Sequence, residues 1–234
     1  MKRFFAAASI SALSFTAFMA SPVNAAPAPY NWTGFYVGAV AGAGVNTPVI
    51  DDYDCNLACT SLSIGNFGGT IGGTVGGNYQ FASNGVVGLE GDFSGAFFKS
   101  SADSVDWPSY HSSSTSWLVT VRGRAGLAVD RALVYVTGGL AEVDQTTKGS
   151  SNANFSCTGE HCFNVSGAKA GAALGAGVEY ALTDNWTMKA EFLDVIVPYS
   201  TVRDTGTDCT TEDYCNFRVS SSMQVARLGV NYKF

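Results

Sequence analysis

Apolar and polar residues alternate along most of the chain in long segments. Between residues 115 and 129, for example, one face is apolar and carries Trp117, Val119, Val121, Ala125, Leu127 and Val129. The opposite face carries Thr120, Arg122, Arg124 and Gly126. A period of two is typical of a β-strand with one buried and one polar face. Eight such segments recur, at about 34–44, 67–81, 85–99, 115–129, 132–148, 167–182, 186–200 and 217–234.

The connections between these segments alternate strictly between short and long. The short ones contain turn-forming residues, namely Asn84-Gly85, Asp130-Arg131 and Thr183-Asp184-Asn185. Asn-Gly in particular is a strong hairpin signal. The long connections cover residues 45–66, 100–114, 149–166 and 201–216. In an up-and-down sheet, every long connection then lies at one end and every short connection at the other.

The beginning of the chain predicts export. Lys2 and Arg3 precede an apolar run, and Val23 to Ala25 fit a small-x-small cleavage site, so residues 1–25 are interpreted as a secretory signal peptide. A membrane anchor is the alternative, but the run is short for a helical span and is interrupted by serines. Residues 26–33 would form a short periplasmic lead-in, and residues 34–234 the folded domain.

Strand length decides between the possible all-β folds. The segments run to about 15 residues, whereas strands of soluble proteins average about five or six. A tilted strand crosses a bilayer with about 9 to 11 residues. Together with export and the alternating connections, this length predicts an eight-stranded antiparallel up-and-down transmembrane β-barrel with its apolar faces outward. A secreted sandwich or a lipocalin-like barrel is the alternative.

The polar faces would then line an interior just wide enough to be filled by side chains. Glycines at 38, 42, 72, 76, 175 and 177 fall on inward faces and would make room for larger neighbours. Eight charged residues are predicted to face inward: Glu90, Asp92, Arg122, Arg124, Glu179, Lys189, Glu191 and Arg227. Buried charges need partners, because an orphaned one costs about 3–5 kcal/mol. They form either a salt-bridged plug or a gate that opens a pore.

Six cysteines occur as three local pairs, each in a different long connection and none in a predicted strand. In an exported protein disulfides are the default, and the clustering favours Cys55–Cys59, Cys157–Cys162 and Cys209–Cys215 among the 15 possible pairings. Metal binding is the alternative, since His161 lies beside Cys162. One histidine with these spacings does not make a zinc signature, so we predict no metal site.

The remaining candidate chemistry is weak. His111 and His161 are the two histidines, both predicted to lie in long loops, and Ser112 to Ser114 follow His111 directly. A solvated serine-rich loop explains that arrangement better than a nucleophile with its base. The acidic stretch Asp51 to Asp54 lacks a calcium-loop signature. We therefore predict no catalytic residue and no cofactor. The net charge of −6 also gives no electrostatic footprint for nucleic acid.

The last eight residues, RLGVNYKF, alternate up to the final position. The apolar members of this pattern are Leu228, Val230, Tyr232 and Phe234. A barrel in lipid has to close, so we expect the last strand to pair with the first. Tyr232 and Phe234 would then lie at the membrane boundary.

Several stretches resemble the small outer-membrane β-barrels of alphaproteobacteria, porin-like surface proteins similar to the OmpA transmembrane domain and to opacity-type proteins. They are NWTGFYVGAVAGAG, GVVGLEGDF, VRGRAGLAVDRALVYVTGGLA, GAGVEYALTDNWTMKAEFL and RLGVNYKF. The resemblance covers nearly every predicted strand but not the loops. It implies an outer-membrane location, contact with lipid and lipopolysaccharide, and a terminal Phe234 similar to the signal that the barrel-assembly machinery reads.

Two functions remain open at this point. The first is a closed, monomeric barrel that supports the envelope and displays disulfide-tied loops to a host or surface ligand. The second is a small porin-like diffusion channel. The resemblance supports both, because some family members are called porins and many are structural. Haem binding, adhesion and lipid-modifying catalysis have weaker support in the residues.

Overall fold

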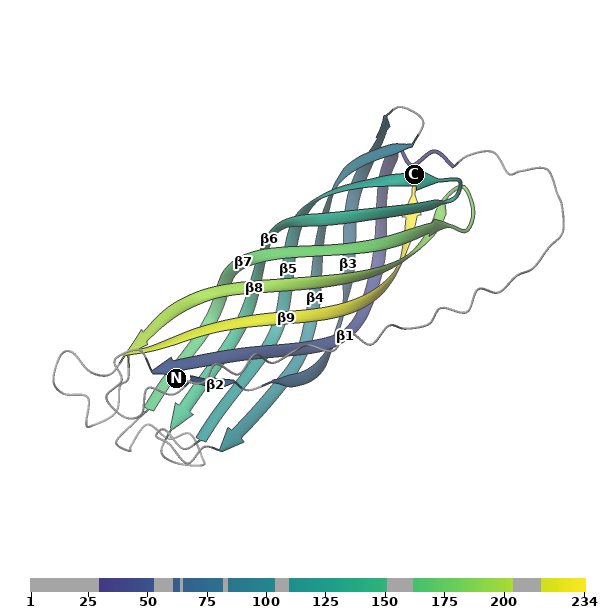
Figure 1. The fold of residues 1–234 in the computed structure, drawn as a ribbon. Coiled ribbons are helices and arrows are strands. Elements are labelled where there is room, and N and C mark those ends of the chain that lie inside the picture. Colours follow the sequence, from purple (N-terminus) through teal and green to yellow (C-terminus); the bar gives the residue numbers. More distant parts are fainter. Residues whose placement is uncertain are drawn as a thin grey trace, which may run out of the picture.

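The computed structural model describes residues 30–52, 61–63, 65–81, 84–103, 110–150, 162–203 and 216–234. The predicted signal peptide and residues 26–29 of the lead-in lie outside the described residues. None of the described residues forms a helix that is long and apolar enough to span a membrane. The predicted fold class is confirmed, because eight antiparallel strands form a closed barrel (Figure 1).

Within the described residues, nine strands make up the sheet, and eight of them form the barrel wall. The bounds are β1 (Gly34–Asp52), β2 (Ser61–Ser63), β3 (Asn66–Phe81), β4 (Gly85–Asp103), β5 (Tyr110–Val129), β6 (Ala132–Ser150), β7 (Cys162–Ala181), β8 (Trp186–Arg203) and β9 (Asn216–Lys233). The short strand β2 pairs only with the end of β1. Each wall strand pairs with its neighbour in sequence order, which is the up-and-down topology that the sequence predicts.

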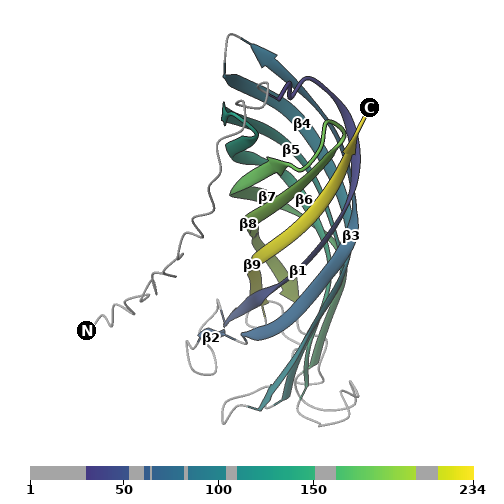
Figure 2. The same ribbon diagram turned by 90° about the vertical axis from the view of Figure 1, so that its right-hand side faces the viewer.

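The first and last strands close the barrel. β1 pairs with β9 in an unbroken register from Tyr36 opposite Lys233 to Asp52 opposite Phe217. We call the end that carries the tight turns and the C-terminus the turn end, and the opposite end the loop end (Figure 1). Outer-membrane barrels have short periplasmic turns and longer extracellular loops, so in a barrel of that type we expect the turn end to face the periplasm. Figure 2 shows the strands tilted and curved around the barrel.

The strands extend further toward the loop end than the sequence predicts. β1 continues to Asp52 and β5 begins at Tyr110, so both include residues that were expected to lie in long connections. His111 is therefore in a strand and buried, which corrects its predicted place in a loop. Cys162 likewise begins β7 and pairs with Ser150. Beyond the lipid an outward apolar face is no longer needed, and the alternating pattern fades although the ladder continues.

The outer wall is apolar over the predicted lipid-facing band. Its most exposed large side chains include Phe35, Leu140, Phe67 and Leu89, each exposed by more than two thirds. At the turn end, aromatic rings gather where the membrane boundary is expected. Tyr232 lies edge-on to Trp186 at 5.1 Å between ring centroids, and to Phe234 at 5.4 Å. Such rings are typical of the aromatic girdle of a membrane barrel.

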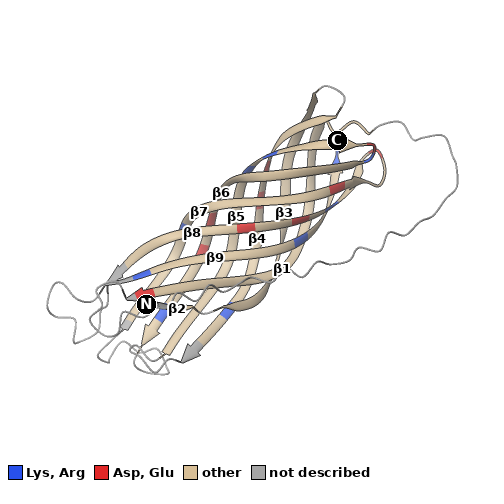
Figure 3. Ribbon diagram, viewed as in Figure 1, with Lys and Arg blue, Asp and Glu red and all other residues tan. Residues whose placement is uncertain are grey.

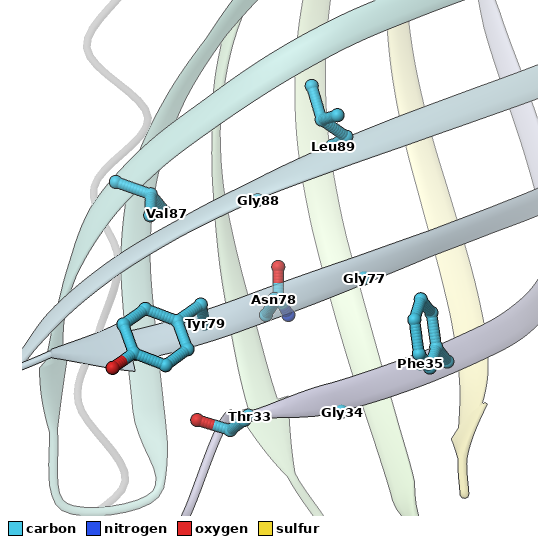
Figure 4. A pocket seen from close by; sticks show the side chains of 9 residues that line it. All are labelled: Thr33, Gly34, Phe35, Gly77, Asn78, Tyr79, Val87, Gly88 and Leu89. Carbon is cyan, nitrogen blue, oxygen red and sulfur yellow. The ribbon is translucent and has the colours of Figure 1, made fainter.

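A shallow groove of about 550 Å³ crosses the outer wall between β1, β3 and β4 near the turn end. Figure 4 shows Phe35, Tyr79, Val87 and Leu89 standing around its glycine-containing floor. The groove faces the surroundings of the barrel and not its interior. Its apolar lining suits contact with lipid chains, and the polar chemistry of the molecule lies on the other side of the wall.

Candidate functional site in the barrel interior

All eight charged residues that the sequence assigns to the interior lie inside the barrel and are buried: Glu90, Asp92, Arg122, Arg124, Glu179, Lys189, Glu191 and Arg227. We call this set the charge network. It joins five strands, β4, β5, β7, β8 and β9. Figure 3 shows most of the barrel ribbon in tan, with acidic and basic positions limited to short parts of the strands. The network contains four acids and four bases, so its formal charge is balanced.

Arg122 lies at the centre of the network and has no exposed side-chain surface. Its guanidinium donates to Glu90 at 2.7 Å and to Asp92 at 2.9 Å, both on the neighbouring strand β4. On the opposite side it lies 3.1 Å from the Glu191 carboxylate of β8. Arg122 Nε also donates to the Thr120 hydroxyl at 2.9 Å. One cation therefore contacts three carboxylates from two walls of the barrel.

Two further cations hold the network together across the interior. Arg227 of β9 donates to Asp92 of β4 at 2.9 Å and pairs with Glu191. Lys189 of β8 donates to Glu90 of β4 at 2.6 Å. The contacts of Arg227 with Asp92 and of Lys189 with Glu90 connect strands that are not neighbours in the sheet, whereas β8 and β9 are neighbours. They bring opposite walls of the barrel together and leave the carboxylates little freedom.

Arg124 extends the network toward the turn end. It donates to Glu179 at 2.6 Å, and its guanidinium lies 4.1 Å from the centre of the Tyr135 ring. Glu179 also accepts from the Asn231 amide at 2.8 Å and from the Thr187 hydroxyl. A carboxylate with three donors and a cation over an aromatic face are both favourable arrangements in a dry interior.

Two tyrosines complete the network, and the sequence reasoning did not identify them. The Tyr36 hydroxyl donates to Glu90 at 2.8 Å, and the Tyr135 hydroxyl donates to Glu191 at 3.0 Å. Each ring lies over an inward glycine of the next strand. An added Cβ would lie 2.5 Å from Tyr36 Cζ at Gly76, and 2.6 Å from the Tyr135 hydroxyl at Gly177. An inward tyrosine opposite an inward glycine is the signal that could have located them.

Apolar side chains fill the interior on the loop-end side of the charge network. This loop-side cluster consists of Ala96, Phe98, Leu118, Ala141, Val143, Ala173, Leu193, Val195, Val197, Met223 and Val225. Phe98, Leu118 and Leu193 have no exposed surface. The sequence prediction expected polar residues inward, so this cluster is a departure from it. An apolar layer is possible here because these side chains are buried against one another.

A second apolar cluster closes the turn end. It consists of Tyr30, Trp32, Val86, Ala128, Leu133, Tyr135 and Ala181. Tyr30 and Trp32 precede β1, and their rings meet edge-on at 4.8 Å between centroids. The Trp32 backbone amide donates to the Gln80 side chain at 2.9 Å. Burial raises the pKa of Tyr30 to about 12, so its hydroxyl stays uncharged at neutral pH. The end of the predicted lead-in therefore acts as a stopper for the barrel.

Replacing Trp32 with alanine should weaken this stopper. The side chain is only 1% exposed, and truncating a buried tryptophan to alanine typically costs about 3–5 kcal/mol. We expect Trp32→Ala to lower the free energy of unfolding in detergent, measured by urea titration of tryptophan fluorescence. Phe35→Ala is the matched control, because Phe35 is 77% exposed on the outer wall. Equal losses in both variants would contradict the stopper.

Polar side chains form a third layer at the loop end. Asn46 of β1 donates to the Thr115 hydroxyl of β5 at 3.2 Å and accepts from the Ser221 hydroxyl at 2.7 Å. Gln145 donates to Ser113 at 3.3 Å. His111 is buried in the same region, with its ring 6.4 Å from that of Phe163. The hydrogen bond between Asn46 and Thr115 joins β1 to β5 across the interior, and the other two join neighbouring strands.

Some predicted site residues cannot be placed. Cys55, Cys59, Cys157, Cys209, Cys215 and His161 lie outside the described residues, so the three disulfides stay predictions. The C-terminal pattern is described: Leu228 and Phe234 are exposed by more than 60%, and Val230 is also exposed. Tyr232 takes part in the aromatic contacts at the turn end.

The arrangement defines the class of protein. A closed antiparallel barrel with an apolar outer wall, an aromatic girdle and a charged interior is an integral membrane β-barrel of the outer-membrane type. Such a wall is stable only when lipid covers it.

Comparison with known proteins identifies the family. Residues 10–234 match the family model described as outer membrane protein beta-barrel domain. The chain therefore belongs to this family and is a protein of the outer membrane. It is 34% identical over 246 residues to the 31 kDa outer-membrane immunogenic protein of Brucella melitensis biotype 1, covering 97% of this chain and 98% of that protein. The protein with the same description from Brucella suis biovar 1 is equally similar.

Solved structures with a related architecture have low sequence identity to the chain. The outer membrane protein OprG of Pseudomonas aeruginosa is 13% identical, with a TM-score of 0.49, over 88% of this chain and 98% of that one. The Neisserial surface protein A is 15% identical, with a TM-score of 0.43, over 86% of this chain and 98% of that one.

Proposed function

We propose that the protein is a closed, non-conducting barrel that supports the outer membrane and presents its loop end to the surroundings. The observation that carries this proposal is the filled interior. From the turn end to the loop end, the interior holds the stopper, the charge network, the loop-side cluster and the polar layer. A diffusion pathway would have to cross all four.

The energetics of the charge network support a plug over an open pore. Each carboxylate of the network contacts at least one cation, and several contacts join walls that are not neighbours. Opening a pore would separate these pairs, and an uncompensated buried charge costs about 3–5 kcal/mol. The loop-side cluster adds an apolar layer that a hydrated ion cannot cross without displacing packed side chains.

A structural role also explains the buried carboxylates and His111, and no catalytic role is needed for them. The carboxylates of the charge network are saturated with cations and hydroxyl donors. His111 is buried within the polar layer, away from the outer wall. We infer that the interior supplies neither a catalytic base to lipid nor a cofactor site. Contact of the loop end with lipopolysaccharide or a surface ligand belongs to the same proposal.

Single-channel recording tests the closed barrel directly. Residues 26–234, refolded under oxidising conditions into planar bilayers, are expected to give no conductance steps. Heat-modifiable gel mobility of the same sample shows that the barrel is folded. Steady and reproducible openings from the folded protein would overturn the proposal and favour the diffusion channel. The charge network would then be the first place to look for a gate.

A further inference from the structure

The barrel wall is not hydrogen-bonded along its whole height between β7 and β8. From the turn end the two strands pair up to Ala172 opposite Ile196, and within their described residues no further pair follows. Beyond that point residues 162–171 of β7 pair with β6, and Val197 and residues 200–203 of β8 pair with β9. Each strand therefore presents an unpaired backbone edge to the other near the loop end. We call this gap the split.

The residues at the split explain why the ladder stops. Pro198 of β8 has no backbone N–H to donate, and the register of β8 shifts between Val197 and Ser200. On the facing strand, Gly167 has φ +127°, a conformation that other residues rarely adopt. The ladder therefore ends next to the irregularity of β8. Gly167 lies five residues beyond the last pair on β7 and keeps its register with Gln145 of β6.

The space beside two glycines of β7 shows where β7 and β8 separate. At Gly171 an added Cβ would lie 3.1 Å from the Ile196 carbonyl carbon and 3.3 Å from Val197 Cα. At Gly167, four residues further toward the loop end, the same atom would meet nothing within 4 Å. The strands are in backbone contact at the first position and apart at the second. The space beside Gly167 is open.

A small pocket occupies the inner side of the split. It has a volume of about 10 Å³ and is lined by Lys169 and Ser200 from the two edges, by Gln145 and Thr147 from β6, and by three valines. A cavity of this size holds about one water-sized atom. The amide, the two hydroxyls and the ammonium can all donate hydrogen bonds, so the pocket suits a single anionic oxygen.

Lys169 makes this pocket unlike the rest of the interior. The charge network is balanced by four acids and four bases, and Lys169 is not part of it. Among the described residues Lys169 has no hydrogen-bond or ion-pair partner, although its side chain lines the pocket and is half-buried. A cation in such a place is stabilised by an anion, and its partial exposure leaves a route for one to enter.

The position of the split relative to the membrane indicates which anion is available to it. On the outer face of β7, Ala168 and Ala170 give way to Asn164 and Ser166 toward the loop end. Tyr199, next to Pro198, is 60% exposed on the outer wall. This change from apolar to polar, together with an exposed tyrosine, marks the boundary between lipid chains and headgroups. Phosphate groups are the anions found at that depth.

We propose that the split between β7 and β8 is a binding site for a phosphate group, with Lys169 as its charge partner. One phosphate oxygen enters the pocket and accepts from Lys169 and Ser200. The group belongs to an outer-leaflet lipid headgroup or is free inorganic phosphate. The site goes beyond the closed barrel, and with a lipid headgroup as its ligand it rests on the lipopolysaccharide contact of the proposed function.

Calorimetric titration of the folded protein in a non-ionic detergent tests the site. The probes are inorganic phosphate and decyl phosphate, which carries the same group on an alkyl chain. We expect Lys169→Met to weaken binding about tenfold or more, since hydrogen bonds between charged groups are stronger than those between neutral groups. Ser200→Leu should weaken binding as well, because it fills the pocket while keeping the lysine. Lys99→Met, at an exposed position of β4, is the matched control.

Each outcome decides the matter. Binding of decyl phosphate alone, dependent on Lys169, supports the site and identifies the lipid headgroup as the source. Binding of both probes supports the site and admits free phosphate. No binding, or binding that Lys169→Met and Lys99→Met change equally, overturns the proposal. Heat-modifiable mobility of every variant ensures that a lost signal is not a lost fold.

Discussion

Replacing Arg122 with methionine is expected to destabilise the barrel more than any other single change of charge. The side chain is fully buried and contacts Glu90, Asp92 and Glu191. Methionine keeps much of the volume but leaves these carboxylates with one cation fewer. Removing one partner of a buried pair costs about 3–5 kcal/mol. Urea unfolding in detergent should show a loss of this size, with Lys99→Met unchanged.

A second variant separates charge from packing. In Arg122→Met with Glu191→Gln, three acids and three bases remain, so the formal balance of the network is restored. We expect the double variant to recover part of the lost stability. If the double variant is no more stable than Arg122→Met alone, the loss comes from packing, and the account of the network as a balanced plug is wrong.

Replacing Gly44 with valine is expected to prevent closure of the barrel. Gly44 lies opposite Val225 at the seam between β1 and β9. An added Cβ would collide with the backbone carbonyl oxygen of Gln224 and lie 2.8 Å from Val225 Cα. Backbone atoms cannot rotate away as a side chain can, so the strands would have to separate. An unpaired seam in lipid exposes hydrogen-bonding groups that each cost several kcal/mol.

Gel mobility measures directly whether the barrel has closed. We expect Gly44→Val to lose the compact, heat-modifiable form after refolding. Gly73→Val is the matched control, because an added Cβ at Gly73 has its nearest neighbour at 3.7 Å, an ordinary contact. It adds the same side chain to the outer face of β3. A folded Gly44→Val barrel, or equal loss of folding in both variants, would contradict the assignment of the seam.

The sequence by itself determined the architecture and the charged residues of the interior. A barrel in lipid imposes a period of two on every strand, and that period assigns Arg122 to the interior and Val121 to the outer wall without any coordinates. The alternating short and long connections determined the order of the strands. The period of two along each strand also identified the eight members of the charge network, although it did not identify Tyr36 and Tyr135.

The tertiary structure alone decided how these side chains are paired. Glu90 and Arg122 are opposite in register, and so are Glu191 and Arg227. Glu179 is opposite Lys189, yet it contacts Arg124 while Lys189 reaches across to Glu90. Contacts across the interior depend on the curvature and stagger of the closed wall, and no short-range sequence pattern encodes them.

The limits of the strands and the closure of their ends were also decided in three dimensions. Beyond the lipid boundary the selection for outward apolar residues ends, so the extension of β5 through His111 leaves no periodic signal. Trp32 precedes the first strand, and only the position of the barrel mouth makes it a stopper. The split beside Lys169 begins where β8 becomes irregular around Pro198, and Gly167 of β7 lies further toward the loop end. Sequence periodicity reports which side of a wall a residue faces, whereas the closed fold determines what that residue meets there.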